Sequence, residues 1–139
     1  MAYDMYKVIG AIVDNGEFSG KIRNMEQNLH PVISIRLFTD EKCFGPGVAA
    51  LLNLVKTCHS LRAAAMEMGM AYSKAWTILK NAEEQLGFKL LLSTTGGKHG
   101  GGAQLTEQGE ALLAAYARYC QTLRDFAQRQ FAADFADFL

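Results

Sequence analysis

The hydrophobic positions in the middle of the chain predict two consecutive helices. Apolar side chains recur at helical spacing from Val48 to Cys58, just after a Gly45-Pro46-Gly47 break. Pro46 suits the first turn of this helix, where its missing N–H would have no partner anyway. Ser60 can cap a second, short helix, LRAAAMEM, by accepting a hydrogen bond from a free backbone N–H.

A third helix is predicted after a tight turn. Met68-Gly69-Met70 forms the turn, because Gly69 readily adopts the conformation that a sharp reversal needs. The helix then runs from about Ala71 to Leu86, and Gly87 ends it. Its buried stripe should comprise Ala75, Ile78, Leu79, Ala82 and Leu86. We also expect Trp76 to anchor the core; the alternative is that its ring serves as a stacking platform.

The segment that follows predicts a β-hairpin with a glycine-rich tip. Phe88–Leu92 is expected to be one strand and Ala103–Leu105 the other. Thr106 then caps a final helix of about 30 residues, whose first turn carries Glu107 and Glu110, where the helix dipole favours negative charge.

The long final helix carries a heptad-like apolar seam. Its members recur at spacings of 4, 3, 4 and 3, and they are Leu112, Tyr116, Tyr119, Leu123 and Phe126. A helix of this length extends roughly 45 Å, further than one small domain can cover. A second copy of the chain along this seam is the simplest way to bury it.

The N-terminal part is less informative. Residues 1–30 contain an Asn15-Gly16 pair that could turn a short hairpin, or they could be a poorly ordered extension. Val32–Phe38 alternates branched and polar residues, as a half-buried strand does.

Composition narrows the class of protein. The 139 residues, half of them hydrophobic, suffice for one core plus appendages. The formal net charge is zero, which excludes a diffusely basic nucleic-acid binder. The charge is uneven, however: Lys56–Lys98 holds six basic and three acidic residues, whereas His99–Leu139 holds three arginines and five acids.

Little in the sequence indicates catalysis or metal binding. Cys43, Cys58 and Cys120 are isolated in apolar stretches, without a zinc or disulfide pattern. The adjacent Cys58 and His59 do not face each other on a helix, so they form no catalytic pair. No apolar run is long enough to span a membrane, and no signal-peptide pattern is present. We therefore expect a cytoplasmic protein that is not an enzyme, with no metal site.

The two short central helices form a helix-turn-helix pattern, which predicts contact with duplex DNA. The second helix of such a pair lies in the major groove and reaches bases with its N-terminal residues. Tyr72 and Ser73 can hydrogen-bond bases or phosphates, and Lys74 offers a cation to phosphate or guanine. The candidate DNA-binding residues of the helices are Ser60, Arg62, Ala71, Tyr72, Ser73, Lys74, Thr77 and Lys80.

The glycine-rich loop Thr94–Gly102 is the candidate wing. Its glycines allow the backbone to approach a phosphate or the minor groove, and Lys98 and His99 add charge at the tip. It could also be an ordinary mobile hairpin tip, and the spacing of its glycines does not fit a nucleotide-binding loop. The candidate DNA-binding residues of the loop are Thr95, Gly97, Lys98, His99 and Gly100.

The motifs MGMAYSKAW and TTGGKHGGGAQLTEQGEALLAAY closely resemble the N-terminal DNA-binding domain of ModE molybdate-responsive transcription regulators, a LysR-like winged helix. The resemblance covers about Ile33–Leu123. It implies a homodimer joined through the long terminal helix, which binds an operator of two-fold symmetry. Ala71 stands where the family commonly has serine, and Ser73 where it has a basic residue. These departures remove a helix cap and a charge, so the operator could differ.

ModE regulators usually continue into a molybdate-binding domain, which we do not find here. We therefore expect the single-domain form, without an assignable cofactor. The fold class should be mainly α with a small β component. It would have an extension (1–30), a winged helix-turn-helix domain (31–105) and a dimerisation helix (106–139). The function expected is a DNA-binding transcription regulator; the alternative is a winged-helix protein-interaction module without DNA binding.

Overall fold

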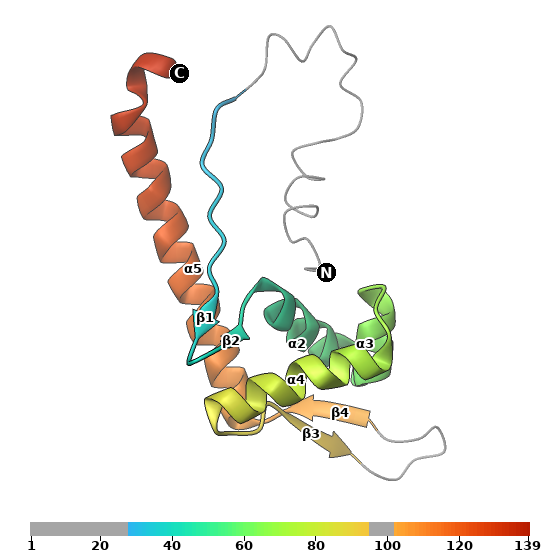
Figure 1. The fold of residues 1–139 in the computed structure, drawn as a ribbon. Coiled ribbons are helices and arrows are strands. Elements are labelled where there is room, and N and C mark those ends of the chain that lie inside the picture. The colour runs from blue at the N-terminus through green and yellow to red at the C-terminus, as the bar shows by residue number, and fades with distance from the viewer. Residues whose placement is uncertain (1–27, 95–101) are drawn as a thin grey trace, which may run out of the picture.

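A computed structural model describes residues 28–94 and 102–139 of the chain. The predicted Asn15-Gly16 hairpin and most of the predicted wing loop lie outside these residues. Figure 1 shows a cluster of short helices, a β-hairpin beneath them and a long helix along the side. The architecture is a winged helix-turn-helix with a long C-terminal helix, as the sequence predicts.

The three central helices begin and end within one or two residues of the predicted positions. Helix α2 (Pro46–Cys58) starts with Pro46 in its first turn. Helix α3 (Leu61–Glu67) is capped by the hydroxyl of Ser60, which accepts from the Ala63 N–H at 3.2 Å. Helix α4 (Tyr72–Leu86) follows the turn at Gly69 and stops at Gly87, whose φ of 81° is left-handed. Glycine adopts this conformation without the steric cost of a Cβ.

The hairpin consists of β3 (Leu91–Thr94) and β4 (Gly102–Leu105), paired antiparallel from Leu91 opposite Leu105 to Thr94 opposite Gly102. The prediction that the first strand begins at Phe88 is wrong. The N–H of Leu90 donates to the carboxylate of Glu83 instead of to a neighbouring strand. Strand pairing therefore starts at Leu91, three residues after the predicted start.

The segment before α2 forms a second, smaller hairpin. Strands β1 (Leu37–Phe38) and β2 (Lys42–Phe44) pair antiparallel. The predicted strand Val32–Phe38 is thus mostly wrong. Its side chains do alternate between half-buried and exposed, but residues 28–36 have no neighbouring strand to pair with. The alternation of apolar and polar residues reflects burial of one side of an extended segment here, not membership of a sheet.

Helix α5 (Glu107–Asp134) is the longest element, with 28 residues. The hydroxyl of Thr106 caps it by accepting from the Gly109 N–H at 2.9 Å, and it also donates to the Lys89 carbonyl at 2.6 Å. One threonine therefore both starts α5 and ties it to the residues that lead into β3. A short 3-10 turn, η1 (Ala136–Phe138), ends the chain.

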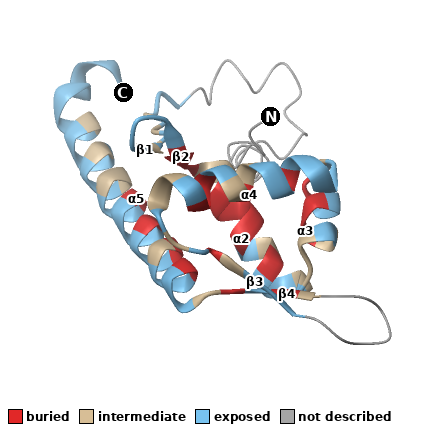
Figure 2. Cartoon of the chain, turned by 60° about the horizontal axis from the view of Figure 1, so that its bottom comes forward, coloured by how far each residue is buried: buried red, intermediate tan, exposed pale blue. Residues whose placement is uncertain are grey.

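The core lies between α2 and the elements around it. Phe44, Leu51, Leu52, Val55 and Leu90 are its largest fully buried side chains. Figure 2 shows that burial is concentrated on α2 and the inward faces of its neighbours, while the far half of α5 is exposed. Among the described residues, no helix is long and apolar enough to cross a membrane.

Gly109 allows α5 to pack closely against the start of β3. A Cβ at this position would lie 2.6 Å from the Leu90 carbonyl oxygen, which itself accepts from the Thr106 N–H. We expect Gly109→Ala to lower the free energy of unfolding by about 1–3 kcal/mol, as overpacking does.

Gly47→Ala is the matched control, because a Cβ there meets nothing within 4 Å. This variant should be neutral or slightly stabilising, since alanine favours a helix. Urea unfolding of both variants measures the difference. Equal effects at the two positions would contradict the close packing of α5 on β3.

Candidate nucleic-acid interface

Helix α4 presents a polar face to solvent on the side away from the core. Ser73 and Thr77 are exposed on this face, while Ala75, Leu79 and Ala82 are buried beneath it. The Thr77 hydroxyl donates to the Ser73 carbonyl at 2.9 Å. The lone pairs of the hydroxyl oxygen remain free to accept a hydrogen bond from a base or water.

The start of α4 has no side-chain cap. Ala71 occupies the N-cap position, and its side chain makes no capping hydrogen bond. Backbone N–H groups of a first helical turn have no partner within the helix. Together with the helix dipole, they favour a negatively charged group such as a phosphate at this end.

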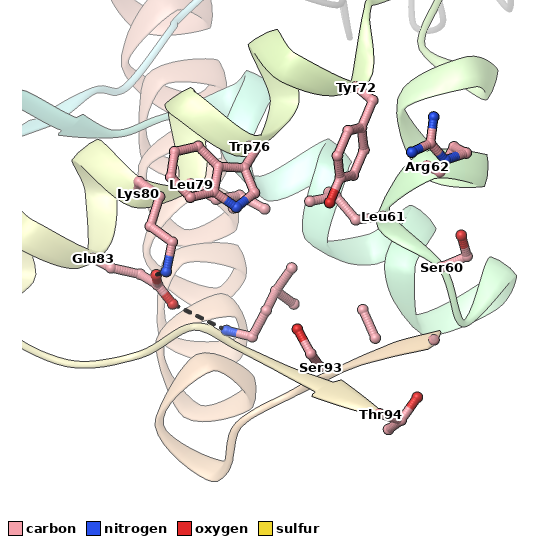
Figure 3. A pocket seen from close by; sticks show the side chains of 13 residues that line it. Ser60, Leu61, Arg62, Tyr72, Trp76, Leu79, Lys80, Glu83, Ser93 and Thr94 are labelled. Atoms are coloured by element: carbon pink, nitrogen blue, oxygen red, sulfur yellow. Dashed lines mark hydrogen bonds and ion pairs between the residues drawn. The ribbon is translucent and has the colours of Figure 1, made fainter. Parts of the chain in front are cut away.

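A groove of about 510 Å³ separates α4 from the β3–β4 hairpin, and we call it the recognition groove. The N-terminal part of α3 closes one end of it, and Figure 3 shows its side chains. Its floor includes the apolar side chains of Leu61, Leu79 and Leu91. The polar and aromatic groups that line it are Ser60, Arg62, Tyr72, Trp76, Lys80, Glu83, Ser93 and Thr94.

Cations lie over both aromatic rings of the recognition groove. The Arg62 guanidinium is 4.4 Å from the centroid of the Tyr72 ring, and the Lys80 ammonium is 5.4 Å from that of Trp76. Both distances allow a cation–π interaction. The prediction that Trp76 anchors the core is wrong, because 48% of this residue is exposed. It follows Tyr72 by one helical turn, on the flank of α4 that faces the hairpin.

Glu83 fixes the position of the hairpin relative to α4. Its carboxylate accepts from the N–H groups of Leu90, at 2.7 Å, and Leu91, at 3.4 Å. The ammonium groups of Lys80 and Lys89 lie 3.3 Å and 3.6 Å from its other oxygen. Two lysines therefore share this single carboxylate.

These contacts determine the charge state of Glu83. Burial by itself raises the pKa of the carboxyl, but the Leu90 and Leu91 N–H groups and Lys80 outweigh it and hold the pKa below its ordinary value. Glu83 is therefore ionised at neutral pH, although only 8% of its side chain is exposed.

The structure brings together about half of the DNA-binding residues predicted for the helices. Ser60, Arg62, Tyr72 and Lys80 line the recognition groove. Ala71, Ser73 and Thr77 are exposed outside it, while Lys74 lines a different hollow. The sequence interpretation missed Trp76, Ser93 and Thr94, although Thr94 bounded the predicted wing. The predicted loop residues Thr95, Gly97, Lys98, His99 and Gly100 lie outside the described part of the chain.

The predicted apolar seam of α5 divides into two groups. Tyr116 packs inside its own chain: it is 6% exposed, its ring meets Phe44 edge-on at 5.0 Å, and its hydroxyl donates to the Ile35 carbonyl at 2.7 Å. This corrects its assignment to a surface seam. Leu112 packs against the same core, and Leu123 is half-buried. Tyr119 and Phe126 are 54% and 56% exposed and remain available to a partner.

Within residues 28–94 and 102–139, no three histidine, cysteine or acidic side chains gather in a way that could hold a metal ion. Lys80 and Glu83 of the recognition groove form a structural ion-pair cluster with Lys89. The groups that face the groove are hydrogen-bond donors, cations and aromatic rings, which suit a polyanion with flat bases and sugars.

Comparison with known proteins agrees with this geometry. Residues 49–110 match the model of the bacterial regulatory helix-turn-helix proteins of the lysR family. This segment includes most of α2, all of α3, α4 and the hairpin strands, and the start of α5. This segment is therefore similar to the helix-turn-helix domain of bacterial transcription regulators.

Curated relatives resemble the chain over a similar length. The molybdenum-pterin-binding protein MopB of Rhodobacter capsulatus is 42% identical over 67 residues, which are 48% of this chain and 25% of MopB. The molybdenum transport protein ModE of Herbaspirillum seropedicae is 35% identical over 58% of this chain and 30% of its own length. The DNA-binding transcriptional dual regulator ModE of Escherichia coli is 32% identical over 60% of this chain and 32% of its own length. The chain thus spans only about a quarter to a third of these relatives.

Glu83 provides a pH-dependent test of the connection between α4 and the hairpin. Glu83→Gln should lower the free energy of unfolding at pH 7 by about 1–3 kcal/mol, because it removes charged hydrogen bonds from a buried site. Folding lowers the pKa of Glu83, so its stabilising effect is complete above the ordinary carboxyl value of 4.5 and disappears as the pH falls through the folded-state pKa.

Urea unfolding between pH 3 and pH 7 would measure this effect, with Glu84→Gln as the control, because Glu84 is the exposed neighbour on the same helix. The difference between wild type and Glu83→Gln should shrink toward acidic pH, while Glu84→Gln should have little effect throughout. A difference that stays constant with pH would contradict an ionised, stabilising Glu83.

Proposed function

We propose that this chain, whose residues 49–110 are a LysR-type helix-turn-helix domain, is a DNA-binding transcription regulator. The recognition groove carries the proposal. It places two cations, two half-exposed aromatic rings and several hydroxyl groups between α4 and the hairpin. A regulator of this kind would act in the cytoplasm, where bacterial DNA lies.

In the proposed complex, α4 enters the major groove and the hairpin reaches the neighbouring minor groove. One DNA backbone then crosses the recognition groove, because it separates the two grooves of the duplex. Arg62 and the hydroxyls of Ser93 and Thr94 would bind its phosphates. Ser73 and Thr77, on the outer face of α4, would read base edges. Lys98, in the glycine-rich loop, would add a phosphate contact.

We further propose a homodimer joined through α5, which would bind an operator of two-fold symmetry. Tyr119, near the middle of this helix, and Phe126 lie seven residues apart, and more than half of each is exposed. Further along, Phe131 stacks on Phe135 with ring centroids 4.8 Å apart, and 43% of Phe135 is still exposed. Large apolar surfaces of this kind mark sites of protein association.

No cofactor is part of the proposed function. The relatives named for molybdenum or molybdenum-pterin extend well beyond the matched segment. In the proposed complex, a DNA backbone occupies the recognition groove.

The test of DNA binding starts from a pool of random duplexes, from which the full chain selects its preferred sequence. Affinity for that duplex and for a scrambled one is then measured by fluorescence anisotropy at several salt concentrations. We expect a preference for the selected duplex and a steep fall of affinity with salt. Failure to bind any duplex at low salt would overturn the proposal in favour of a protein-interaction module.

Two variants separate positioning from base reading. Lys98→Ala should weaken binding to both duplexes and reduce the salt slope by about one. Ser73→Ala should instead reduce the preference for the selected duplex, while the salt slope stays the same. Uniform weakening by Ser73→Ala would exclude base reading by this residue.

The homodimer is tested by placing charge on the exposed side of α5. The double variant Tyr119→Glu, Phe126→Glu should shift the protein from dimer to monomer, because burying two carboxylates in an apolar interface is costly. Sedimentation velocity measures the mass. Gln121→Glu together with Gln128→Glu is the matched control, at exposed polar positions of the same helix. If the wild type is a monomer, or if both double variants dissociate equally, the proposed interface is wrong.

A further inference from the structure

A second hollow, of about 310 Å³, lies on the other flank of α4 from the recognition groove. Tyr72, Trp76 and Lys80 line the recognition groove, whereas Lys74, Ile78 and Asn81 line this second hollow. At 100° per residue, Lys74 and Trp76 point about 160° apart around the helix axis. The exposed face with Ser73 and Thr77 lies between the two hollows.

Three cations from three different elements line this second hollow, and we call them the basic rim. Arg36 comes from the segment before β1, Lys42 from β2 and Lys74 from α4. None of the residues that line the hollow is acidic, and Asp40 and Glu41, in the turn of the β1–β2 hairpin, are not among them. Within the described part of the chain, the basic rim takes part in no ion pair.

Contacts within the fold hold the basic rim beside α4. The Arg36 guanidinium donates to the Ser34 hydroxyl at 2.8 Å, and its other N–H groups can reach a ligand. A Cβ at Gly45 would lie 3.3 Å from the Cγ of Arg36, so Gly45 makes room for this side chain. The Thr39 hydroxyl donates to Gln85, which fastens the β1–β2 hairpin to α4.

The dimensions of duplex DNA would place a second backbone beside the basic rim. The major groove is about 12 Å wide, and a helix with its side chains measures about 10–12 Å across, so an inserted helix lies close to both backbones that border the groove. One backbone would cross the recognition groove. The other would then lie against the opposite flank of α4, where the basic rim is.

We propose that Arg36, Lys42 and Lys74 bind phosphate diesters of this second DNA backbone. The inference rests on the proposed DNA binding of α4 and extends it to Arg36 and Lys42, which precede the matched residues 49–110. These contacts position α4 in the groove and carry no base specificity.

The test uses the full chain, the duplex that it selects from a random pool, and a scrambled duplex. Arg36→Ala and Lys42→Ala should each reduce the salt slope by about one, and the double variant by about two. Each single variant should bind both duplexes roughly fivefold to tenfold more weakly at 0.1 M salt, with the preference between them unchanged. Lys42→Arg should restore the slope that Lys42→Ala loses.

Arg129→Ala is the matched control, because it removes the same charge from an exposed position on the far half of α5. Its salt slope should equal that of the wild type. Thermal melting of each variant shows whether the fold is retained. If the double variant melts like the wild type and binds DNA with the wild-type salt slope, the proposed role of the basic rim is wrong. The proposed function would still stand, because it rests on DNA binding by the wild type. A slope reduced equally by Arg129→Ala would also overturn the proposed role of the basic rim, because overall charge would then explain the effect.

A further experiment shows whether the ligand of the basic rim is DNA phosphate or a free oxyanion. Sodium phosphate and sodium chloride are compared at equal pH and ionic strength, without DNA. Phosphate stabilises folded proteins generally, because it is excluded from their surfaces, so we expect the change in Tm between the two salts to be the same for the wild type and for the double variant. A rise in Tm with phosphate that requires Arg36 and Lys42, together with unchanged DNA salt slopes, would assign the rim to a free oxyanion and overturn the proposal.

Discussion

The geometry of the whole recognition surface depends on the buried carboxylate of Glu83. It lies near the end of α4 and accepts from the two N–H groups that lead into β3. Without it, those donors would be left without a partner at a site that water scarcely reaches, which is costly. The same carboxylate pairs with Lys80, which lines the groove, and with Lys89. One side chain thus sets the position of the hairpin and the placement of two cations.

A second set of contacts fixes the hairpin from the other side. The carbonyl of Leu90 accepts from the Thr106 N–H, and Gly109 lets α5 approach that carbonyl. The Ala103 N–H donates to the carbonyl of His59, at the C-terminal cap of α2. The strands β3 and β4 are therefore tied to α2, α4 and α5. A shift of the hairpin on DNA would be transmitted through these contacts to α5.

The parts of the fold that sequence reasoning predicted correctly are those set by local chemistry. Ser60 and Thr106 cap helices because a hydroxyl can satisfy a nearby N–H, and Gly87 ends one because it tolerates a left-handed conformation. These rules need only a few neighbouring residues. They sufficed to place the three central helices within one or two residues, and to place the start of α5.

The parts that failed depend on partners distant in the chain. Trp76 was expected in the core because it is large and apolar, but only the three-dimensional arrangement places it beside the hairpin, under Lys80. Tyr116 fits a surface seam by its spacing, whereas its hydroxyl bonds to Ile35, 81 residues away. Most of the strand predicted at Val32–Phe38 lacks a partner strand, and only Leu37–Phe38 pairs. No local pattern encodes any of these three outcomes.

The central claim is that α4 and the groove beside it receive duplex DNA. The most direct measurement is an NMR titration of the ¹⁵N-labelled chain with its selected duplex, which follows the amide signals residue by residue. The account predicts the largest changes at Ser73 and Thr77, around Arg62, and at Ser93 and Thr94, with little change in the far half of α5. Changes concentrated on α5, or no changes on α4 when the duplex is bound, would contradict it.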